Sequence, residues 1–546
     1  MGRSTIRCMT IRPYKTGASR EQPSLLPPRI EDYVSADNLV RAIEAYVCSL
    51  DLAALGFRHA ERDGGAGQPP YDPADLLGLY LYGYLNRVRS SRALERETRR
   101  NLEVIWLLKG LSPGYRTLGN FRRDNWSALK ATNRAFVMLL RSLDLVGGEV
   151  VAIDGAFFDA SASKASIMPA RRLADQVAAL ERDIEAYGAA LEANDAADAS
   201  DAVAHDEGPG GTIAEKLAAL RSRAAQSKAE LDRLTASGEG QVSRTDPDAR
   251  LLSKRGQTLA GYNVQIAVDE RHKLIVASEV VNHGNDTGQL HAMARAAKDA
   301  LEVATLSVVA DTGYYNGETL QACEADAITA YVPPARHGGR LAAQGRFSHE
   351  EFRYDAAADA YVCPAGARLT PKTGDKIDAS GKRQIRYVSS RSACRACALH
   401  DRCLTAKAKQ RTIYRWEHEA VTERHRTRMA DAAAALMMRR RAELAEHPFG
   451  TLKCRAGYRH FLLRGFDKVR GEWSLMALCY NFTRVLSIIG FDRFVASLAR
   501  YRKTAAILLP NAVLAACHRA TTVIARGCAT IALYRLVQAK MLHPSH

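Results

Sequence analysis

The chain has 546 residues, more than one hydrophobic core accommodates, so two to four domains are expected. Its formal net charge of +17 favours a polyanionic partner, while 47% apolar and 25% charged residues are ordinary for a globular protein. No apolar run reaches the roughly 18 residues of a membrane span, and the N-terminus lacks the apolar segment of a secretion signal, so neither a membrane protein nor a secreted one is expected.

The N-terminal part of the chain is predicted to be all-helical. Residues 1–24 are expected to form a flexible basic leader, and residues 25–145 carry apolar residues at three- and four-residue spacing. The pair Asp72-Pro73 after a Gly/Pro-rich loop predicts a helix start. The segment LSPGYRTLGNFRRDNWSALKAT predicts a turn and a basic helix, in which Arg122 and Arg123 are candidate DNA contacts. A helix-turn-helix-like DNA-binding element and a helical bundle with solvated arginines both fit this segment.

From Gly148 the pattern changes to short β-branched runs. Val150–Phe157 is the first predicted strand, and residues 165–240 are predicted to form a helical hairpin inserted after it. Strands resume at Ala260–Asp269 and Lys273–Val281, joined by a hairpin turn, and two more strands alternate with helices up to residue 333. Without the insertion, residues 148–333 predict a mixed α/β sheet of three antiparallel strands extended by parallel ones, as in a ribonuclease-H-like core.

Three further regions follow this core. Residues 334–415 form a second insertion, which contains a group of cysteines, and residues 416–490 are a helical region expected to complete the core. Residues 491–546 are predicted to be a helical tail. Its apolar stretch 508–526 is interrupted by Arg519, which favours a packing helix over a membrane span.

Three acidic residues occupy places where such a fold would gather them. Asp154 follows the first β run in VVAIDGAFFDA, Asp311 follows LSVVA in ADTGYYNG, and Glu446 lies among helix formers in AEHPFGTLK. The first and fourth strands of this fold are neighbours, and ligands of open α/β sheets gather at the carboxyl ends of the strands. Carboxylates there can hold two Mg²⁺ or Mn²⁺ ions, which suits phosphodiester cleavage on nucleic acid. Glu443, one turn earlier, is an alternative third acid.

Other acids flank the same strands and compete for these roles. They are Asp159, Asp246, Asp248, Asp269 and Asp286. A single Asp after a strand is usually a turn or cap residue, so the order and spacing of the three acids together carry the prediction.

A dense basic stretch surrounds the third acid. Its candidate DNA contacts are Arg441, Lys453, Arg455, Arg459 and Arg464. Such cations can neutralise phosphates. Tyr458, Phe461, Phe466 and Trp473 interleave with them, and these aromatic side chains either stack on unpaired bases or form a core, of which the core is favoured.

The second insertion contains four cysteines that could bind a metal. They are Cys363, Cys394, Cys397 and Cys403. Four thiolates match tetrahedral Zn²⁺, and a CxxC motif places two of them on one turn. The interval from Cys397 to Cys403 is longer than the usual second knuckle, so a zinc-stabilised module and four reduced, metal-free thiols both fit. His400 is a possible substitute ligand.

The motifs IDGAFFDA, ADTGYYNG and EHPFGTLK, with TDPDARLLSKRGQTLAGYNVQIAVD and GYRHFLLRGFDKVRGEWSLMALCYNFTRVL, resemble those of bacterial insertion-sequence DDE transposases. The resemblance covers roughly Pro27 to Leu486. It implies a ribonuclease-H-like core behind a helical N-terminal domain that helps to recognise DNA. It also implies a catalytic, metal-binding triad of Asp154, Asp311 and Glu446.

Related elements carry a Tyr, Arg, Glu, Lys signature in which six residues separate the Glu from the Lys. Glu446 and Lys453 match that spacing. The places of the signature's Arg and Tyr hold Ala442 and Arg439 here, so the pattern departs at both. Arg441 could substitute for the missing Arg.

The function implied is DNA transposition, by metal-dependent cleavage at element ends and strand transfer into target DNA. The implied partners are double-stranded DNA, as terminal inverted repeats and target, and a second copy of the chain in a synaptic complex. A bacterial cytoplasmic, nucleoid-associated location is expected, and similar cysteine-containing insertions in the family favour structural zinc. A ribonuclease-H-like nuclease or resolvase without strand transfer, and a non-catalytic transposon-derived DNA-binding protein, are the alternatives.

Overall fold

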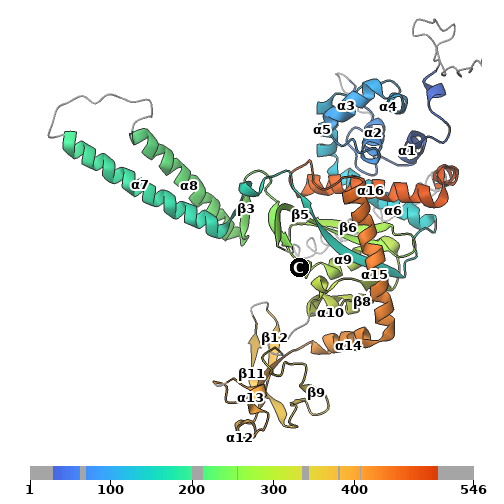
Figure 1. The fold of residues 1–546 in the computed structure, drawn as a ribbon. Coiled ribbons are helices and arrows are strands. Elements are labelled where there is room, and N and C mark those ends of the chain that lie inside the picture. Colours follow the sequence, from blue (N-terminus) through green and yellow to red (C-terminus); the bar gives the residue numbers. More distant parts are fainter. Residues whose placement is uncertain are drawn as a thin grey trace, which may run out of the picture.

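The computed structural model describes residues 29–61, 69–198, 213–254, 256–334, 343–378, 381–405 and 407–501 (Figure 1). The predicted leader at 1–24 and most of the predicted tail, including the packing helix at 508–526, lie outside the described residues.

The N-terminal region is a group of helices, as predicted. They are η1 (Ile30–Tyr33), α1 (Leu39–Cys48), α2 (Pro73–Leu85), α3 (Ser91–Arg100), α4 (Leu102–Leu107), α5 (Tyr115–Asp124) and α6 (Trp126–Ser142). Helix α2 begins at the predicted place, because the Asp72 carboxylate accepts a hydrogen bond from the Ala74 amide at 2.8 Å and Pro73 occupies the first turn. Almost every residue of α2 is buried, which makes it the central helix of this region.

A mixed sheet forms the centre of the molecule. Its strands are β1 (Val150–Asp159), β4 (Arg250–Lys254), β5 (Gln257–Asp269), β6 (Ile275–Val281), β7 (Leu306–Val309) and β8 (Ile328–Tyr331). The order is β4-β5-β1-β7-β8, with β6 also paired to β5. Strand β1 is antiparallel to β5 and parallel to β7, and β7 is parallel to β8. The first and fourth strands predicted from the sequence, β1 and β7, are therefore neighbours.

Helices cover both faces of this sheet. Helix α9 (Leu290–Leu301) packs against β6, β5 and β1, with α10 (Gly317–Ala325) beside it. Helix α15 (Ala432–Gly450), which follows α14 (Glu419–Ala430), crosses β1, β5, β7 and β8. Because successive strand residues point to opposite faces, Ala152 packs against Leu444 and Ala445 of α15, while Val151 and Ile153 belong to the main core.

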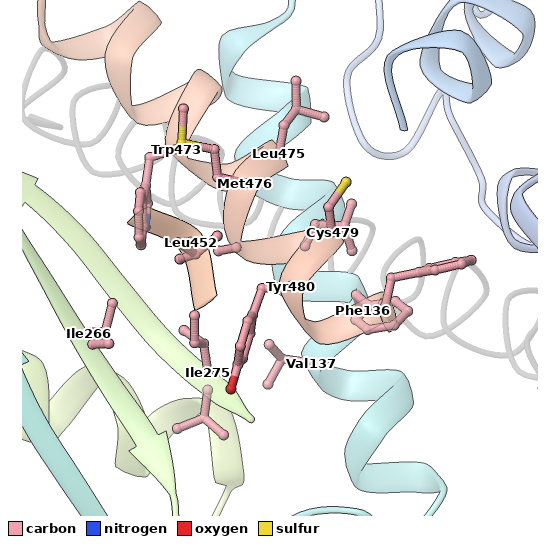
Figure 2. Close-up of a cluster of buried hydrophobic side chains, with 14 of the residues drawn as sticks. Phe136, Val137, Ile266, Ile275, Leu452, Trp473, Leu475, Met476, Cys479 and Tyr480 are labelled. Carbon is pink, nitrogen blue, oxygen red and sulfur yellow. The ribbon is translucent and has the colours of Figure 1, made fainter. Parts of the chain in front are cut away.

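Helix α16 (Phe466–Ile489) joins the N-terminal helices to the sheet. Figure 2 shows its side chains Trp473, Met476 and Tyr480 between the sheet and helix α6. A Cβ atom at Gly471 would come 2.8 Å from Trp126 Cα, so the close approach of α16 and α6 requires glycine there. Within the described ranges no single helix is long and apolar enough to cross a membrane; only α16 and the helix Phe491–Tyr501 pass that test together, and they are bent by 112°.

A buried carboxylate fixes this junction. Glu472 is fully buried and accepts hydrogen bonds from the Leu462 and Leu463 amides at 2.9 to 3.2 Å. The Tyr84 hydroxyl of α2 donates to the same carboxylate at 3.3 Å. The N-terminal helices, α16 and the loop before α16 are therefore tied together at one polar centre.

Two insertions leave the core, as the sequence predicted. The first is a hairpin of α7 (Ala170–Asp198) and α8 (Ile213–Ser237), which projects away from the sheet (Figure 1). A short antiparallel ladder of β2 (Ile167–Pro169) and β3 (Gln241–Ser243) closes its base. The described residues of the second insertion include a five-stranded sheet and the short helices α12 (Arg391–Arg395) and α13 (His400–Cys403). The strands are β9 (Arg353–Asp355), β10 (Ala360–Val362), β11 (Arg368–Ile377), β12 (Arg383–Ser389) and β13 (Thr412–Trp416).

Candidate active site

Asp154 and Asp311 come together in the middle of the central sheet, where β7 ends beside the middle of β1. This place is named the sheet edge, because β7 reaches its carboxyl end there. In the parallel pairing of β1 with β7, Ala152 lies beside Val309, so the two aspartates each follow this pair by two residues. An oxygen of each carboxylate lies 3.8 Å from the same Nη2 atom of Arg441. The two oxygens can therefore be no further apart than twice that distance.

The local backbone orients both carboxylates. Asp154 Oδ1 accepts a hydrogen bond from the Gly155 amide at 2.9 Å. Asp311 is the N-cap of a short 3-10 helix, η3 (Thr312–Tyr314), and its Oδ1 accepts from the Gly313 amide at 2.9 Å. The Asp154 side chain is 16% exposed and that of Asp311 35%, so both can be reached by a ligand from solvent.

Arg441 of α15 supplies the positive charge between these two acids. Like-charged carboxylates in one site repel each other, and a guanidinium between them offsets that repulsion. Arg441 Nε is buried and has no hydrogen-bond partner among the described residues. The sequence predicted Arg441 as a DNA contact and did not anticipate its position between the aspartates.

Glu446, the third predicted acid, is exposed on α15 and has no hydrogen-bond or ion-pair partner within the described part of the chain. Leu444, Ala445, Pro448 and Phe449 form the buried side of the helix, which turns Glu446 away from the sheet. Among the described residues, no group of three or more His, Cys, Asp or Glu is arranged to hold a metal ion. Of the predicted triad, Asp154 and Asp311 therefore lie together, and Glu446 does not join them. Arg441 lies between the two aspartates instead.

Pro448 lies inside α15. The helix continues through Pro448 to Gly450 and then widens into a π-helical turn, η4 (Thr451–Arg455). Turns of this kind are frequent at functional sites.

Glu443, the alternative third acid, lies at the other end of the sheet. It lines a cavity of about 640 Å³ together with Gly147 and Glu149, which precede β1, and with Lys273, which precedes β6. Asp154 lies in the middle of β1, and Asp311 follows the carboxyl end of β7, away from this cavity. Glu443 is therefore not beside the two aspartates, and Glu446 as the acid that α15 contributes stays a prediction.

The predicted basic residues after Glu446 lie in space along the end of β1. Lys453 Nζ donates a hydrogen bond to the Phe157 carbonyl at 2.6 Å and lies 4.4 Å from the centre of the Phe158 ring. Arg464 Nε donates to the Ser161 carbonyl at 2.9 Å, and the Arg459 carbonyl accepts from the Asp159 amide at 3.0 Å. The side chains of Arg455, Arg459 and Arg464 are exposed. An exposed basic rim therefore lies along the strand that carries Asp154.

The aromatic side chains of this segment are mostly core residues. Tyr458, Phe461 and Trp473 are at most 2% exposed, and Phe466 is half-buried. These side chains cannot stack on unpaired bases without leaving the core, which agrees with the favoured interpretation of the sequence.

The two arginines predicted to contact DNA in the N-terminal region differ in their exposure to solvent. Arg122 is only 5% exposed, and its guanidinium donates to the Tyr84 hydroxyl and to the Arg89 carbonyl, both at 3.2 Å. The prediction that Arg122 contacts DNA is therefore wrong, because contacts distant in the sequence bury its charge. Arg123 is exposed and pairs with Asp124 at 2.6 and 2.9 Å.

Three of the competing acids have structural roles. Asp246 and Asp248 accept from the Gly465 and Phe466 amides, at 2.9 and 2.8 Å, and so hold the start of α16. Asp269 accepts from the Gly147 and Gly148 amides at the turn before β1.

Asp286 is a competing acid for which the sequence predicted no role near the two aspartates. It is 9% exposed, and its Oδ1 accepts from Asn263 Nδ2 at 2.8 Å and from Gln265 Nε2 at 2.7 Å. The Tyr314 hydroxyl donates to Gln265 Oε1, which links this group to the turn after Asp311. The signal available in the sequence was the pair of amide side chains in the otherwise apolar strand GYNVQIAVD.

The four cysteines of the second insertion line one cavity of about 380 Å³. The Ser389 hydroxyl lies 3.0 Å from Cys394 Sγ, and Cys397 Sγ accepts from the Leu399 amide at 3.4 Å. Burial raises the pKa of the Cys403 thiol, Arg411 lowers it, and the other three cysteines raise it further. His400 lines the same cavity and pairs with Asp401 at 3.1 Å. The thiols share one space without forming a metal-binding arrangement among the described residues.

Two parts of the chain match protein families. Residues 28–124 match the family described as transposase domain (DUF772), and residues 362–486 match the family described as transposase DDE domain. No curated protein matches the chain. A cryo-EM structure of the piggyBac transposase synaptic complex with hairpin DNA is 8% identical, over 85% of this chain and 81% of that chain, with a TM-score of 0.27. A TM-score that low carries no argument about the fold or the site.

Proposed function

We propose that this chain is an insertion-sequence DDE transposase and that the edge carrying Asp154 and Asp311 is its catalytic site. The premise is that an N-terminal transposase domain followed by a DDE domain indicates such an enzyme. Enzymes of this kind cut and transfer DNA with divalent metal ions. The single observation that carries the assignment is the convergence of two aspartates from neighbouring parallel strands on one arginine. The mixed sheet order is compatible with a ribonuclease-H-like core, which we include in the proposal.

The residues at this edge fit a hard divalent cation such as Mg²⁺. Carboxylate oxygens are the ligands such ions prefer, and Asp154 and Asp311 offer them at a solvent-accessible edge. When bound there, divalent ions would activate the attacking hydroxyl and offset charge on the leaving oxygen. Glu446 is the third proposed ligand, from α15. Arg441 holds the two aspartates together and competes with a cation for their charge.

The exposed basic rim supports double-stranded DNA as the substrate. Arg455, Arg459 and Arg464 lie along the end of β1, where their charges can neutralise phosphates on either side of a bond held at the aspartates. Lys453 is fixed against β1 through the Phe157 carbonyl and places a further charge beside that edge. We include a second copy of the chain in the proposal, as the partner in a synaptic complex.

We also propose that Cys363, Cys394, Cys397 and Cys403 bind structural Zn²⁺. The four side chains line one cavity, and thiolates are the ligands that zinc prefers in closed structural sites. Zinc content of the purified chain, measured by plasma mass spectrometry, tests this directly.

The proposed catalysis is tested on a labelled duplex that carries the element's own ends, with Mg²⁺ or Mn²⁺. Wild type is compared with Asp311→Asn and with Asp159→Asn, a matched acid at the exposed end of β1. Metal-dependent nicks and joined products are expected with wild type and Asp159→Asn, and neither with Asp311→Asn. Nicks without joined products would favour a nuclease or resolvase. DNA binding without cleavage in all three proteins would favour the non-catalytic alternative.

A further inference from the structure

A buried polar group lies directly behind the proposed catalytic edge. It consists of Asp286, Asn263, Gln265 and Tyr314, which are all at most 9% exposed. Asp286 Oδ1 accepts from both amide side chains, and Gln265 accepts in turn from the Tyr314 hydroxyl. Burying a carboxylate is costly unless its hydrogen bonds are made, so this group is built around Asp286.

The position of Asp286 explains the glycine that follows Asp154, and Asp286 also lies near the glycine of the turn after Asp311. A Cβ atom at Gly155 would come within 2.4 Å of Gln265 Nε2 and 2.7 Å of Asp286 Oδ1. A Cβ atom at Gly313 would lie 3.0 Å from Asp311 Oδ1 and 3.9 Å from Asp286 Oδ2. The motif IDG therefore needs glycine because the polar group occupies the space where a side chain would stand. At Gly313 the tight neighbour is the Asp311 carboxylate, and Asp286 lies at ordinary contact distance.

Asp286 acts from the face opposite to that of Asp154. Residues that are directly paired across antiparallel strands point to the same face, and Gly155 pairs with Gln265 while Asp154 pairs with Ile266. The amides that bind Asp286 are thus on the side of α9, whereas Asp154 faces Arg441 on α15. Asp286 is placed to support the catalytic edge and not to join its ligands.

The connection to Asp311 runs through Tyr314. Tyr314 ends the short helix that Asp311 caps, and its hydroxyl binds Gln265, which Asp286 holds. Burial raises the pKa of Tyr314, and Asp286, Asp154 and Asp311 raise it further. The phenol therefore remains protonated and keeps donating to Gln265. One hydrogen-bonded chain runs from Asp286 to the turn that sets Asp311.

A buried acceptor beside Gly155 points to a ligand at this place. Asn263 is fully buried, and its Oδ1 has no hydrogen-bond partner among the described residues. The same oxygen would lie 3.1 Å from a Cβ atom at Gly155. Unpaired buried acceptors are rare and are usually completed by water or a ligand, so a water molecule bound behind Gly155, on the face of Asp286, would supply the missing donor.

We propose that Asp286 is a positioning residue of the catalytic edge, which fixes the spacing of Asp311 and Asp154 through Gln265 and Tyr314 and thereby sets the affinity for the divalent cation. This inference rests on the proposed function. Groups that orient metal ligands without touching the metal typically change its affinity about 10- to 100-fold when they are lost.

The test measures Mn²⁺ binding by the full-length chain without DNA, from the loss of the free Mn²⁺ signal in electron paramagnetic resonance. Asp286→Ala, which removes the acceptor, is expected to weaken binding at least about 10-fold. Asp286→Asn keeps an oxygen that can accept both amide hydrogen bonds, so it is expected to bind close to wild type. Asp246→Asn is the matched control, since Asp246 is equally buried and accepts from Tyr262 and Gly465 at the start of α16.

The outcomes separate this inference from the proposed function. Absence of Mn²⁺ binding by wild type would overturn both. Binding lost in Asp154→Asn but unchanged in Asp286→Ala would overturn the inference alone. Asp286→Asn as weak as Asp286→Ala would show that the charge acts on the cation, which contradicts a positioning role. If Asp286→Ala does not fold, Tyr314→Phe removes only the hydroxyl link, and unchanged affinity in that variant would equally overturn the inference.

Discussion

The sheet edge and the cysteine insertion each bring candidate metal ligands together. They differ in the charge of these ligands and in what a metal ion would have to displace. At the edge, two carboxylates share an internal cation, Arg441, which lies 3.8 Å from both. In the insertion, four thiols line a cavity, and burial keeps the thiol of Cys403 protonated to a higher pH than usual. A metal at the edge therefore competes with a guanidinium, whereas a metal in the insertion competes with protons. With the proposed metals bound, we therefore expect exchange at the first site and lasting occupancy at the second.

The largest expected effect is the loss of catalysis at the edge. Asp154→Asn should reduce metal-dependent DNA cleavage by more than about 100-fold, because it removes a proposed ligand and not only a supporting contact. The loss is measured as the rate of nicking on the element-end duplex. Zinc content should stay as in wild type, and a parallel loss of zinc would show that the two sites are not independent.

The next effect tests the insertion. Changing Cys394 and Cys397 to Ser should abolish stoichiometric zinc binding, since tetrahedral sites need all four ligands. Thermal unfolding followed by circular dichroism should show earlier melting of this part of the chain. Mn²⁺ binding to the edge should remain. A protein that keeps its zinc after this change would favour metal-free thiols in the native chain.

A smaller effect is expected at Arg441, the internal cation. Arg441→Gln should bind Mn²⁺ more tightly, by up to about 5-fold, because partly exposed charge pairs of this kind contribute about 1 kcal/mol or less. The metal-free protein should be less stable, since the two aspartates then repel without compensation. Arg440→Gln is the matched control, because Arg440 pairs with Glu270 instead. Weaker Mn²⁺ binding in Arg441→Gln would contradict the competition between guanidinium and metal.

The smallest expected effect is on stability, at the contact between helix α14 and the end of strand β8. His425 of α14 is 1% exposed, and its Nε2 lies 2.7 Å from the Val332 carbonyl, which follows β8. Burial lowers the pKa of His425. As pH falls through the ordinary value near 6.5, the unfolded chain takes up a proton that the folded chain resists. Stability should therefore fall below pH 6.5, by at most about 1.4 kcal/mol per pH unit.

Urea unfolding at pH 7 and pH 5.5 measures this loss, with His425→Gln as the reference. The glutamine variant does not titrate, so the wild type should lose more stability than the variant over this interval. Equal losses in both proteins would assign the pH dependence to other groups.

The sequence predicted those features that depend on neighbouring residues. The cap at Asp72, the position of β1 and the projecting hairpin follow from short patterns and were found where expected. The meeting of Asp154 and Asp311 followed from strand order, because the parallel register places Ala152 of β1 beside Val309 of β7. Each of these predictions needed only local propensity or the order of elements along the chain.

The features that the sequence did not predict depend on side chains that meet across long stretches of chain. Arg122 is buried because Tyr84 and Glu472 come together at the junction with α16. Arg441 fills the space between the aspartates only because α15 crosses the sheet at that place. The role of Asp286 depends on two amides from another strand. No periodicity in the sequence records such contacts.

The short ladder at the base of the helical hairpin has a practical consequence for protein engineering. The chain leaves the core at Ile167 and returns at Ser243, and these two residues are direct partners across β2 and β3. Entry and exit points this close let a segment be exchanged without stretching the remainder of the chain. The hairpin is thus a natural cassette, into which a fluorescent reporter or an affinity tag can be grafted to follow the protein on DNA.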